Sequence, residues 1–169
     1  MTSTGESIIL GIDPGSRCTG YGIVKEVSGR LSLVKAGTIR PDQTGDMSVR
    51  LAGIFAGISS LVQEFRPAEA AVEEVFTARN ASSALKLGQA RGAAVVACSH
   101  LGIPVFSYEP TMIKKSVVGV GRADKDQVAF MVARLLGARD SLARDATDAL
   151  AVAVTHLNHR RLTRLKGWK

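Results

Sequence analysis

Four acidic side chains occur in or beside apolar segments, where acidic residues are uncommon. Asp13 ends the apolar run "IILGID" and precedes a Pro-Gly pair, and Glu73 lies within "AAVEEVF". Asp145 and Asp148 stand three positions apart in "DATDALAVAV". On a helix this spacing puts both side chains on one face, which continues into Val152 and is therefore expected to point at the sheet rather than at water.

Four carboxylates converging on one buried site would repel each other, and their pKa values would rise unless a cation compensated the charge. Mg²⁺ and Mn²⁺ prefer oxygen ligands, and the sequence contains no His/Cys cluster that would favour zinc. Two such ions about 3.5–4 Å apart are a known arrangement for phosphodiester hydrolysis. The four acids therefore predict a site for Mg²⁺ or Mn²⁺, with two ions in each active site.

Each acid also has a simpler interpretation, and the residues alone leave these alternatives open. Asp13 before Pro-Gly could be a turn residue. Asp145 and Asp148 could stabilise a helix N-terminus electrostatically. Glu73 could occupy a solvated edge of a strand, and Glu74, the next residue, should point the opposite way by strand alternation.

The charge of the chain is unevenly distributed. The 169 residues carry a net charge of +7, but residues 1–77 hold seven basic and nine acidic side chains, whereas residues 78–169 hold fifteen basic and six acidic ones. A strongly basic half favours an anionic polymer as partner, and nucleic acid is the first candidate. A basic protein without such a partner is the alternative.

The hydrophobic pattern predicts the elements that must position the acids. Three strand-like segments linked by short turns indicate an antiparallel meander, and apolar spacings of three and four later in the chain indicate amphipathic helices. The expected strands are 8–13, 19–27, 31–39, 70–76 and 103–108; the expected helices are 47–65, one from Asn80 or Ser82 to about 101, a short one from 110, one from 124 or 125 to 136, and 145–159. This order predicts an α/β fold: a mixed five-stranded sheet flanked by helices, with the helix-linked strands parallel.

Length and composition indicate one domain, placed at residues 1–159, followed by a basic tail at 160–169 that we expect to be mobile. No apolar run reaches the ~18 residues of a transmembrane helix, and the N-terminus lacks the pattern of a signal peptide. Cys18 and Cys98 form no disulfide framework and are expected to be reduced thiols. We therefore expect a cytoplasmic protein without membrane contact.

Five segments, taken together and in order, closely resemble the RuvC family of Holliday junction resolvases. They are "GIDPGSRCTGYGIV", "VEEVF", "NASSALKLGQARG", "VVGVGRADK" and "DATDALA", and the resemblance extends from about residue 8 to 157. It implies a ribonuclease H-like fold, a homodimer, and metal-dependent cleavage of four-way DNA junctions at two symmetric positions. It also implies that Asp13, Glu73, Asp145 and Asp148 are the four catalytic acids and metal ligands.

The same resemblance implies roles for residues that would contact DNA. Lys114 and Lys125 match basic family positions near the active site, where a lysine neutralises charge that develops on the scissile phosphate. Phe76 follows Glu73 by three residues and has two possible roles. Its ring could stack on a base near the junction centre, or it could be an ordinary core residue. Candidate phosphate contacts are Arg79, Lys86, Arg91, Lys115 and Arg122, although simple surface solvation is the favoured interpretation of each one taken alone.

Partners also follow from the family. Two symmetric cuts need two active sites, which a two-fold dimer supplies. The helix expected over 80–101 is a candidate interface because it carries small and apolar residues, among them Ala84, Leu87, Ala93, Ala94 and Ala97. Burial within one subunit explains them equally well. The branch-migration proteins RuvA and RuvB are implied as partners.

Two functions of other classes compete with a resolvase. One is a protein that binds junctions without cutting them. The other is a nucleotide-binding phosphotransferase of the actin-like type, which shares the strand-Asp-turn opening but generally needs two such domains, more than 169 residues without a repeat provide.

Overall fold

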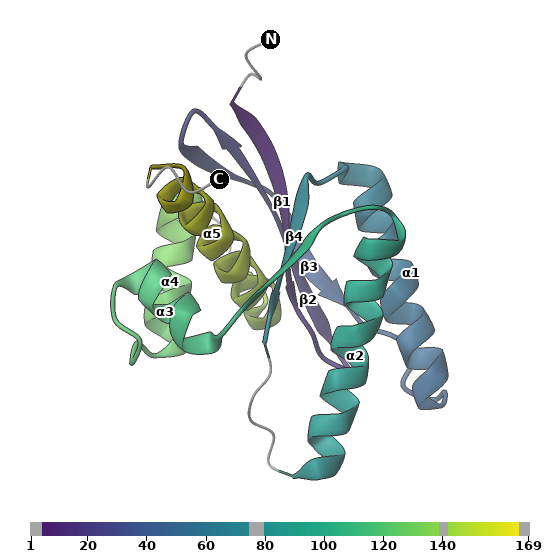
Figure 1. Cartoon of the computed structure of the whole chain (residues 1–169). Helices are drawn as coiled ribbons and strands as arrows, with labels where there is room; N and C mark the ends of the chain where they lie inside the picture. Colours follow the sequence, from purple (N-terminus) through teal and green to yellow (C-terminus); the bar gives the residue numbers. More distant parts are fainter. Residues whose placement is uncertain (1–4, 75–79, 139–141, 166–169) are drawn as a thin grey trace.

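The computed structural model describes residues 5–74, 80–138 and 142–165. Its centre is a five-stranded sheet with the strand order β3-β2-β1-β4-β5 and helices on both faces (Figure 1). The elements are β1 (Glu6–Asp13), β2 (Thr19–Val27), β3 (Arg30–Ile39), α1 (Met47–Phe65), β4 (Glu69–Glu73), α2 (Ala81–His100), β5 (Val105–Tyr108), α3 (Pro110–Val118), α4 (Lys125–Leu136) and α5 (Arg144–Leu165).

The pairing of the strands is mixed, as predicted. β1, β2 and β3 form an antiparallel meander, whereas β4 pairs parallel with both β1 and β5. The carboxyl ends of β1 and β4 therefore lie next to each other at one edge of the sheet. This arrangement confirms the expected mixed five-stranded sheet.

Strand alternation divides the core into two layers. In β1, Leu10 and Ile12 pack into the core under α1 and α2, while Ile9 packs into the core under α3, α4 and α5. Figure 1 shows these two groups of helices on opposite sides of the sheet. None of the helices in the described ranges has both the length and the apolar character needed to span a membrane.

Local capping explains where two helices begin. The side chain of Asn80 accepts a hydrogen bond from the backbone N–H of Ser83 at 2.9 Å, which makes Asn80, not Ser82, the N-cap of α2. Asp124 caps α4 in a reciprocal capping box with Gln127. α4 therefore begins at Lys125, which fixes the position of this lysine beside the acids.

The C-terminal boundary predicted from the sequence is wrong. α5 does not end at 159 but continues to Leu165, because two arginines of this segment bind the sheet. Arg160 donates to Ser7 Oγ at 2.8 Å, and Arg161 donates to Glu26 Oε1 at 2.9 Å. Residues 160–165 thus belong to the folded domain, while 166–169 lie outside the described residues.

Helix α5 lies directly on the backbone of β1 and β2. Three glycines make this possible: Gly11 and Gly22 are paired across the two strands, and Gly20 is paired with Asp13. A Cβ at Gly11 would overlap the carbonyl oxygen of Ala149, and one at Gly20 would overlap the carbonyl oxygen of Asp145. The absence of these side chains therefore lets the first two turns of α5 reach the end of β1.

We predict that Gly11→Ala destabilises the protein by about 3 kcal/mol, because the added methyl group meets helix backbone that cannot move aside without displacing α5. For a chain of this size that loss lowers Tm by roughly 6–12 °C in thermal unfolding followed by circular dichroism. Gly121→Ala is the matched control, since its nearest neighbour, the carbonyl oxygen of Thr111, would lie at an ordinary 3.6 Å. Equal Tm values for the two variants would show that the close contact between Gly11 and α5 does not contribute to stability.

Candidate active site

Asp13 and Glu73 end two adjacent parallel strands. Ile12 is paired with Val72 in the β1–β4 ladder, so the next position on each strand is an acid. Ile12 and Val72 face α1 and α2. By alternation the two carboxyl groups lie on the opposite face, under α5, where they hydrogen-bond each other.

The turn behind Asp13 is fixed by Thr19. Its buried hydroxyl donates to the carbonyl oxygen of Gly15 at 2.8 Å and accepts from the N–H of Gly15 at 3.2 Å. A Cβ at Gly15 would overlap the carbonyl oxygen of Cys18, so the turn is tight enough to require glycine. The chain is thereby directed away from Asp13, and the carboxylate stays open to a ligand.

Helix α5 brings the other two acids. Asp145 lies in its first turn and Asp148 one turn later, and both are close enough to Asp13 to raise its pKa. Asp148 Oδ2 also accepts a hydrogen bond from Lys125 Nζ at 2.9 Å. The fold thus gathers four acids from β1, β4 and α5 at one edge of the sheet, as the sequence predicts.

This gathering of negative charge changes the ionisation of the strand acids. Burial, together with the neighbouring Glu73, Asp148 and Asp145, raises the pKa of Asp13 to about 8. Burial also raises the pKa of Glu73, against the hydrogen bond from Asp13 and the charges of Lys125 and Lys114. Without a cation, the site therefore holds a proton that an exposed carboxylate would release at neutral pH.

Asp13, Glu73 and Asp148 line an open hollow of about 470 Å³. Two of the predicted cations, Lys114 of α3 and Lys125 of α4, line the same space. We refer to it as the acidic pocket; its lining residues are Asp13, Pro14, Glu73, Glu74, Leu87, Pro110, Ile113, Lys114, Lys125, Val128, Asp148 and Ala151. A hollow with acids on one side and ammonium groups on the other suits a ligand that combines metal ions with phosphate.

Several predicted residues lie elsewhere. Asp145 is not among the residues that line the hollow, and its carboxylate is a hydrogen-bonding neighbour of the Cys18 thiol. Lys86, Lys115 and Arg122 are exposed, and Arg91 donates a hydrogen bond to Ser107 Oγ at 2.7 Å. None of these four residues lines the hollow. Phe76 and Arg79 lie outside the described residues.

Strand β4 is shorter than the expected 70–76, so strand alternation does not determine the direction of Glu74. Alternation along a strand over 70–76 would turn it away from Glu73, but β4 ends at Glu73 and Glu74 lines the acidic pocket as well. Its N–H donates to the carbonyl oxygen of Tyr108 at 2.9 Å, as the chain leaves the ladder. Alternation cannot be extended past the last residue of a strand.

The donor set fits a hard divalent cation, although the side chains are not yet arranged around one. No group of three acidic, His or Cys side chains within the described ranges is already in a metal-binding arrangement. Asp148 is instead bonded to Lys125, and Asp13 to Glu73. Buried carboxylate oxygens with raised proton affinity are the ligands that Mg²⁺ and Mn²⁺ bind, so the residues present fit such an ion.

Sequence reasoning missed a buried network further along α5. His156 hydrogen-bonds the hydroxyl of Tyr108 at 2.7 Å through Nδ1 and Glu69 Oε2 at 2.8 Å through Nε2. Burial lowers the pKa of His156, and Glu69 opposes that effect. Since Tyr108 is paired with Glu73 in the β4–β5 ladder, the network ties α5 to the strands that carry the site. The sequence contains one signal for this position: His156 follows Asp148 by eight residues, which places both on the same side of the helix, toward the sheet.

The sequence matches the family model described as crossover junction endodeoxyribonuclease RuvC over residues 9–156. Among curated proteins it is 60% identical to the crossover junction endodeoxyribonuclease RuvC of Solidesulfovibrio magneticus, with 99% of each chain covered. It is 59% identical to the protein of the same name from Oleidesulfovibrio alaskensis, with 98% of each chain covered.

A solved structure is similar as well. Thermus thermophilus RuvC in complex with Holliday junction substrate superposes with a TM-score of 0.87 and 34% sequence identity, covering 92% of this chain and 96% of that one. The similarity confirms the predicted ribonuclease H-like fold. It also favours the nuclease over the nucleotide-binding alternative.

We predict that Asp13→Asn stabilises the metal-free protein at alkaline pH. With an ordinary pKa of 3.8 and a folded value of about 8, Asp13 keeps its proton in the folded state where the unfolded chain has lost it. The contribution of Asp13 to the stability of the wild-type protein therefore falls as pH rises from about 4 to about 8. In EDTA, the variant should melt at least about 5 °C above wild type at pH 8.5, and the difference should vanish near pH 4.

The matched control for this prediction is Glu64→Gln, which removes an exposed carboxylate paired with Lys35. It should change stability by less than about 0.5 kcal/mol at every pH. Parallel pH profiles for wild type and Asp13→Asn would contradict the charge crowding inferred for the site.

Proposed function

The chain belongs to the RuvC family of crossover junction endodeoxyribonucleases, and on that premise we propose that it resolves four-way DNA junctions with the acids of the acidic pocket. The observation that carries the assignment of the site is the adjacency of Asp13 and Glu73 under Asp148, with the pKa of Asp13 raised to about 8. Such crowding is characteristic of a site that works with bound cations.

Family membership implies a divalent metal, and we propose two Mg²⁺ or Mn²⁺ ions held by Asp13, Glu73, Asp145 and Asp148. When bound, two such ions would activate the attacking water and stabilise the leaving oxygen. The chain's own contribution is positioning: two ligands stand on strand ends and two on the first turns of a helix packed on the sheet. Rigid elements hold such groups more accurately than loops do.

Lys114 and Lys125 partly balance the negative charge of the acids. Lys125 binds Asp148, and the bonded carboxylate raises the pKa of Lys125, so the ammonium group stays charged. Lys114 lines the pocket near enough to Glu73 to lower its pKa. We propose that Lys114 pairs with the scissile phosphate as negative charge develops there, and that Lys125 contacts a neighbouring phosphate oxygen.

Other basic residues extend the proposed DNA path away from the pocket. Lys86 precedes the lining residue Leu87 on α2, and Arg122 lies in the loop that leads to Lys125. Both side chains are exposed and available to phosphates. Phe76 and Arg79 are proposed as further DNA contacts because of the resemblance to the RuvC family.

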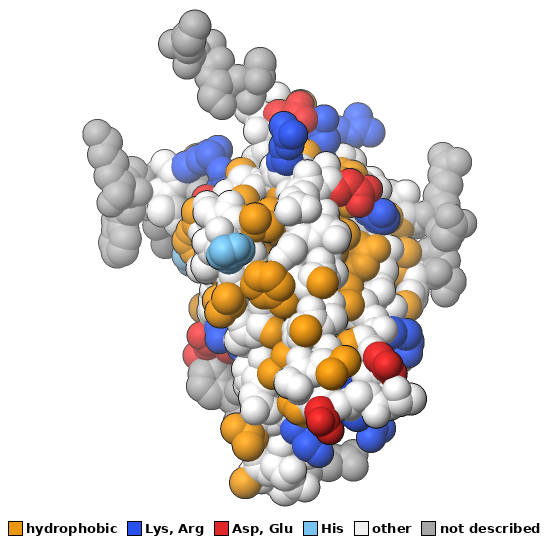
Figure 2. Space-filling model, turned by 90° about the vertical axis from the view of Figure 1, so that its right-hand side faces the viewer, with side chains coloured by type: hydrophobic (Ala, Val, Ile, Leu, Met, Phe, Trp, Pro, Cys, Tyr) orange, Lys and Arg blue, Asp and Glu red, His pale blue; other side chains and the backbone are white. Residues whose placement is uncertain are grey.

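We propose a homodimer formed through α2. Leu85 and Val96 are 64% and 56% exposed, and Gly88 and Gly92, between them on the same helix face, have no neighbouring atoms within 4 Å of an added Cβ. Figure 2 shows hydrophobic side chains over the middle of the α1–α2 face, with charged side chains above and below. Two small residues four apart let a second helix approach closely.

Two of the candidate interface residues suggested by the sequence do not fit this proposal, whereas Ala84 is exposed on α2. Ala94 and Ala97 are buried within the subunit and cannot contact a second copy. The exposed side of α2 instead presents Leu85 and Val96. RuvA and RuvB remain proposed partners, and a cytoplasmic location is proposed from the two free cysteines and the DNA substrate.

The test of the nuclease uses a mobile four-way junction with Mg²⁺ or Mn²⁺. Wild type should make paired symmetric nicks that EDTA abolishes. Glu73→Gln should slow nicking by at least about 10³-fold, because it removes a charged metal ligand, while junction affinity stays within about threefold. Glu64→Gln, which removes an acid remote from the pocket, should cut like wild type.

The competing functions give different results. Tight junction binding without nicks under either metal would indicate a junction-binding protein rather than a nuclease. Cleavage that survives Glu73→Gln would contradict the assigned site while leaving the nuclease in place.

For the dimer, we predict that Leu85→Glu with Val96→Glu produces a monomer of 17.8 kDa in light scattering, whereas wild type has twice that mass. The two added charges would be buried against each other across a two-fold axis. Phe130→Glu, which charges an equally exposed apolar residue on α4, should leave the dimer intact. A dimeric double variant would exclude α2 as the interface.

A further inference from the structure

A second hollowed surface lies along the C-terminal half of α5. Two adjoining hollows of about 540 and 710 Å³ share Met112 of α3 and His159 of α5. We name their combined surface the α3–α5 groove. It has no lining residue in common with the acidic pocket, so it is a separate feature of the molecule.

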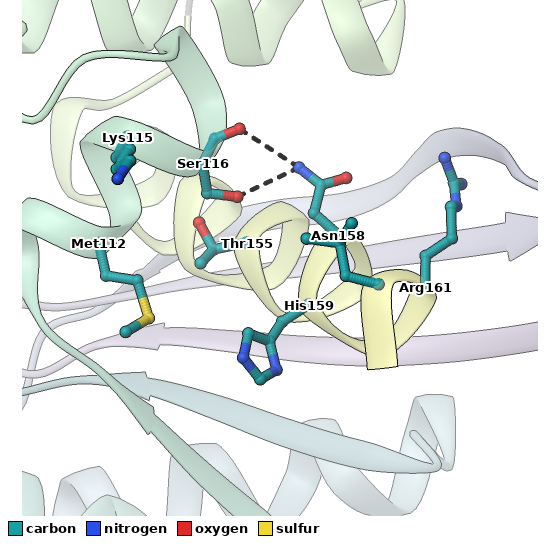
Figure 3. Close-up of a pocket in the computed structure, with 8 residues that line it drawn as sticks. Met112, Lys115, Ser116, Thr155, Asn158, His159 and Arg161 are labelled. Atoms are coloured by element: carbon teal, nitrogen blue, oxygen red, sulfur yellow. Dashed lines mark hydrogen bonds between the residues drawn. The ribbon is translucent and has the colours of Figure 1, made fainter. Parts of the chain in front are cut away.

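The floor of the groove is held by hydrogen bonds. Asn158 Nδ2 donates to the carbonyl oxygen of Ser116 at 3.4 Å and to its hydroxyl at 3.2 Å, which ties α5 to α3 (Figure 3). Under the second hollow, His156 is bonded at both ring nitrogens, to Tyr108 and Glu69. The groove is therefore formed by two packed helices and a strand.

Large apolar side chains are exposed around this floor. Phe106 of β5 is 41% exposed, Met112 of α3 is 45% exposed and Leu162 of α5 is 55% exposed. Figure 3 shows Met112 and His159 reaching toward the same space from their two helices. Methionine and aromatic residues in a concave patch are typical of protein–protein interfaces.

The charge of the groove is positive. Lys115, Arg161 and Arg164 contribute cations, and Glu69 is the one carboxylate that lines either hollow among the described residues. Glu69 is already bonded to His156 and to Arg160. Within the described part of the chain, Lys115 and Arg164 have no ion-pair partner. An occupant that supplies carboxylates would complement both.

We propose that the α3–α5 groove is a docking site for an acidic, amphipathic helix of a partner protein. A helix with apolar residues at i, i+4 and i+7 would cover Met112 and Leu162, and acids on its flanks would reach Lys115 and Arg164. The lined stretch of α5 from Thr155 to Leu162 is about 10 Å long, enough for two turns of such a helix. A DNA backbone would satisfy the cations but leave the exposed apolar side chains without a partner.

The groove lies behind the helices that build the active site. α3 places Ile113 and Lys114 in the acidic pocket and Met112 and Lys115 in the groove. α5 likewise carries Asp148 toward one and His159 toward the other. A docked partner would thus hold the enzyme through the scaffold of its site without covering the acids.

The test is a selection of random 16-residue peptides displayed on phage against the full-length protein, followed by fluorescence anisotropy of the enriched peptides. We expect enriched sequences to be acidic and apolar at helical spacing. Leu162→Glu and Arg164→Glu should each weaken their binding at least tenfold. Arg134→Glu, which makes the same charge change on α4, should weaken it less than twofold, since Arg134 lines neither hollow.

Three results would overturn the proposal. They are enriched peptides that bind Leu162→Glu as well as wild type, equal losses in Arg134→Glu and Arg164→Glu, and no enriched peptide at all. Light scattering of Leu162→Glu adds a fourth: loss of the dimer would make the groove a contact between two copies of this chain. Because both variants leave the acids intact, junction nicking reports on the nuclease separately.

Discussion

The contact of α5 with the glycine-lined backbone of β1 and β2 is the constraint on which the site depends. A helix that packs through ordinary side chains stands away from the sheet, and its first turn would not reach the strand ends. Here Gly11 and Gly20 leave room for the carbonyl oxygens of Ala149 and Asp145. The acids of the helix and the strands consequently meet without a loop to position any of them. Hydrogen bonds of His156 and Arg160 then fix the rest of the helix on the same face.

Bringing these carboxyl groups together is electrostatically unfavourable in the metal-free protein. Packing free energy from a core of apolar strands and α5 holds the carboxyl groups together against burial and mutual repulsion, and the raised pKa of Asp13 reports that cost. Lys125 offsets part of it through Asp148. The arrangement is therefore stable enough to persist yet retains a strong affinity for positive charge, which a cation-dependent nuclease requires.

Much of the fold follows from local pattern, and the exceptions have physical causes. α1 occupies the predicted 47–65 because its apolar spacing, its preceding loop and Pro67 all agree. The end of α5 was misjudged because Arg160 and Arg161 look like solvated tail residues until β1 and β2 bring Ser7 and Glu26 beside them. The acids were identifiable because carboxylates are rare in apolar segments. The glycine contact was not, since which backbone a glycine meets is decided by residues more than a hundred positions away.

Strand alternation also determines how the remaining surfaces are divided. Because Asp13 and Glu73 face α5, the proposed catalytic acids lie in that layer, and the opposite layer of α1 and α2 carries exposed apolar residues such as Leu85 and Val96. Within the α5 layer the helix itself separates two tasks along its length: its first turns serve the acidic pocket and its last turns line the groove. The surfaces proposed for nucleic acid, a second copy and a protein partner are therefore separate ones built on the same rigid elements, and the acidic pocket and the α3–α5 groove have no lining residue in common.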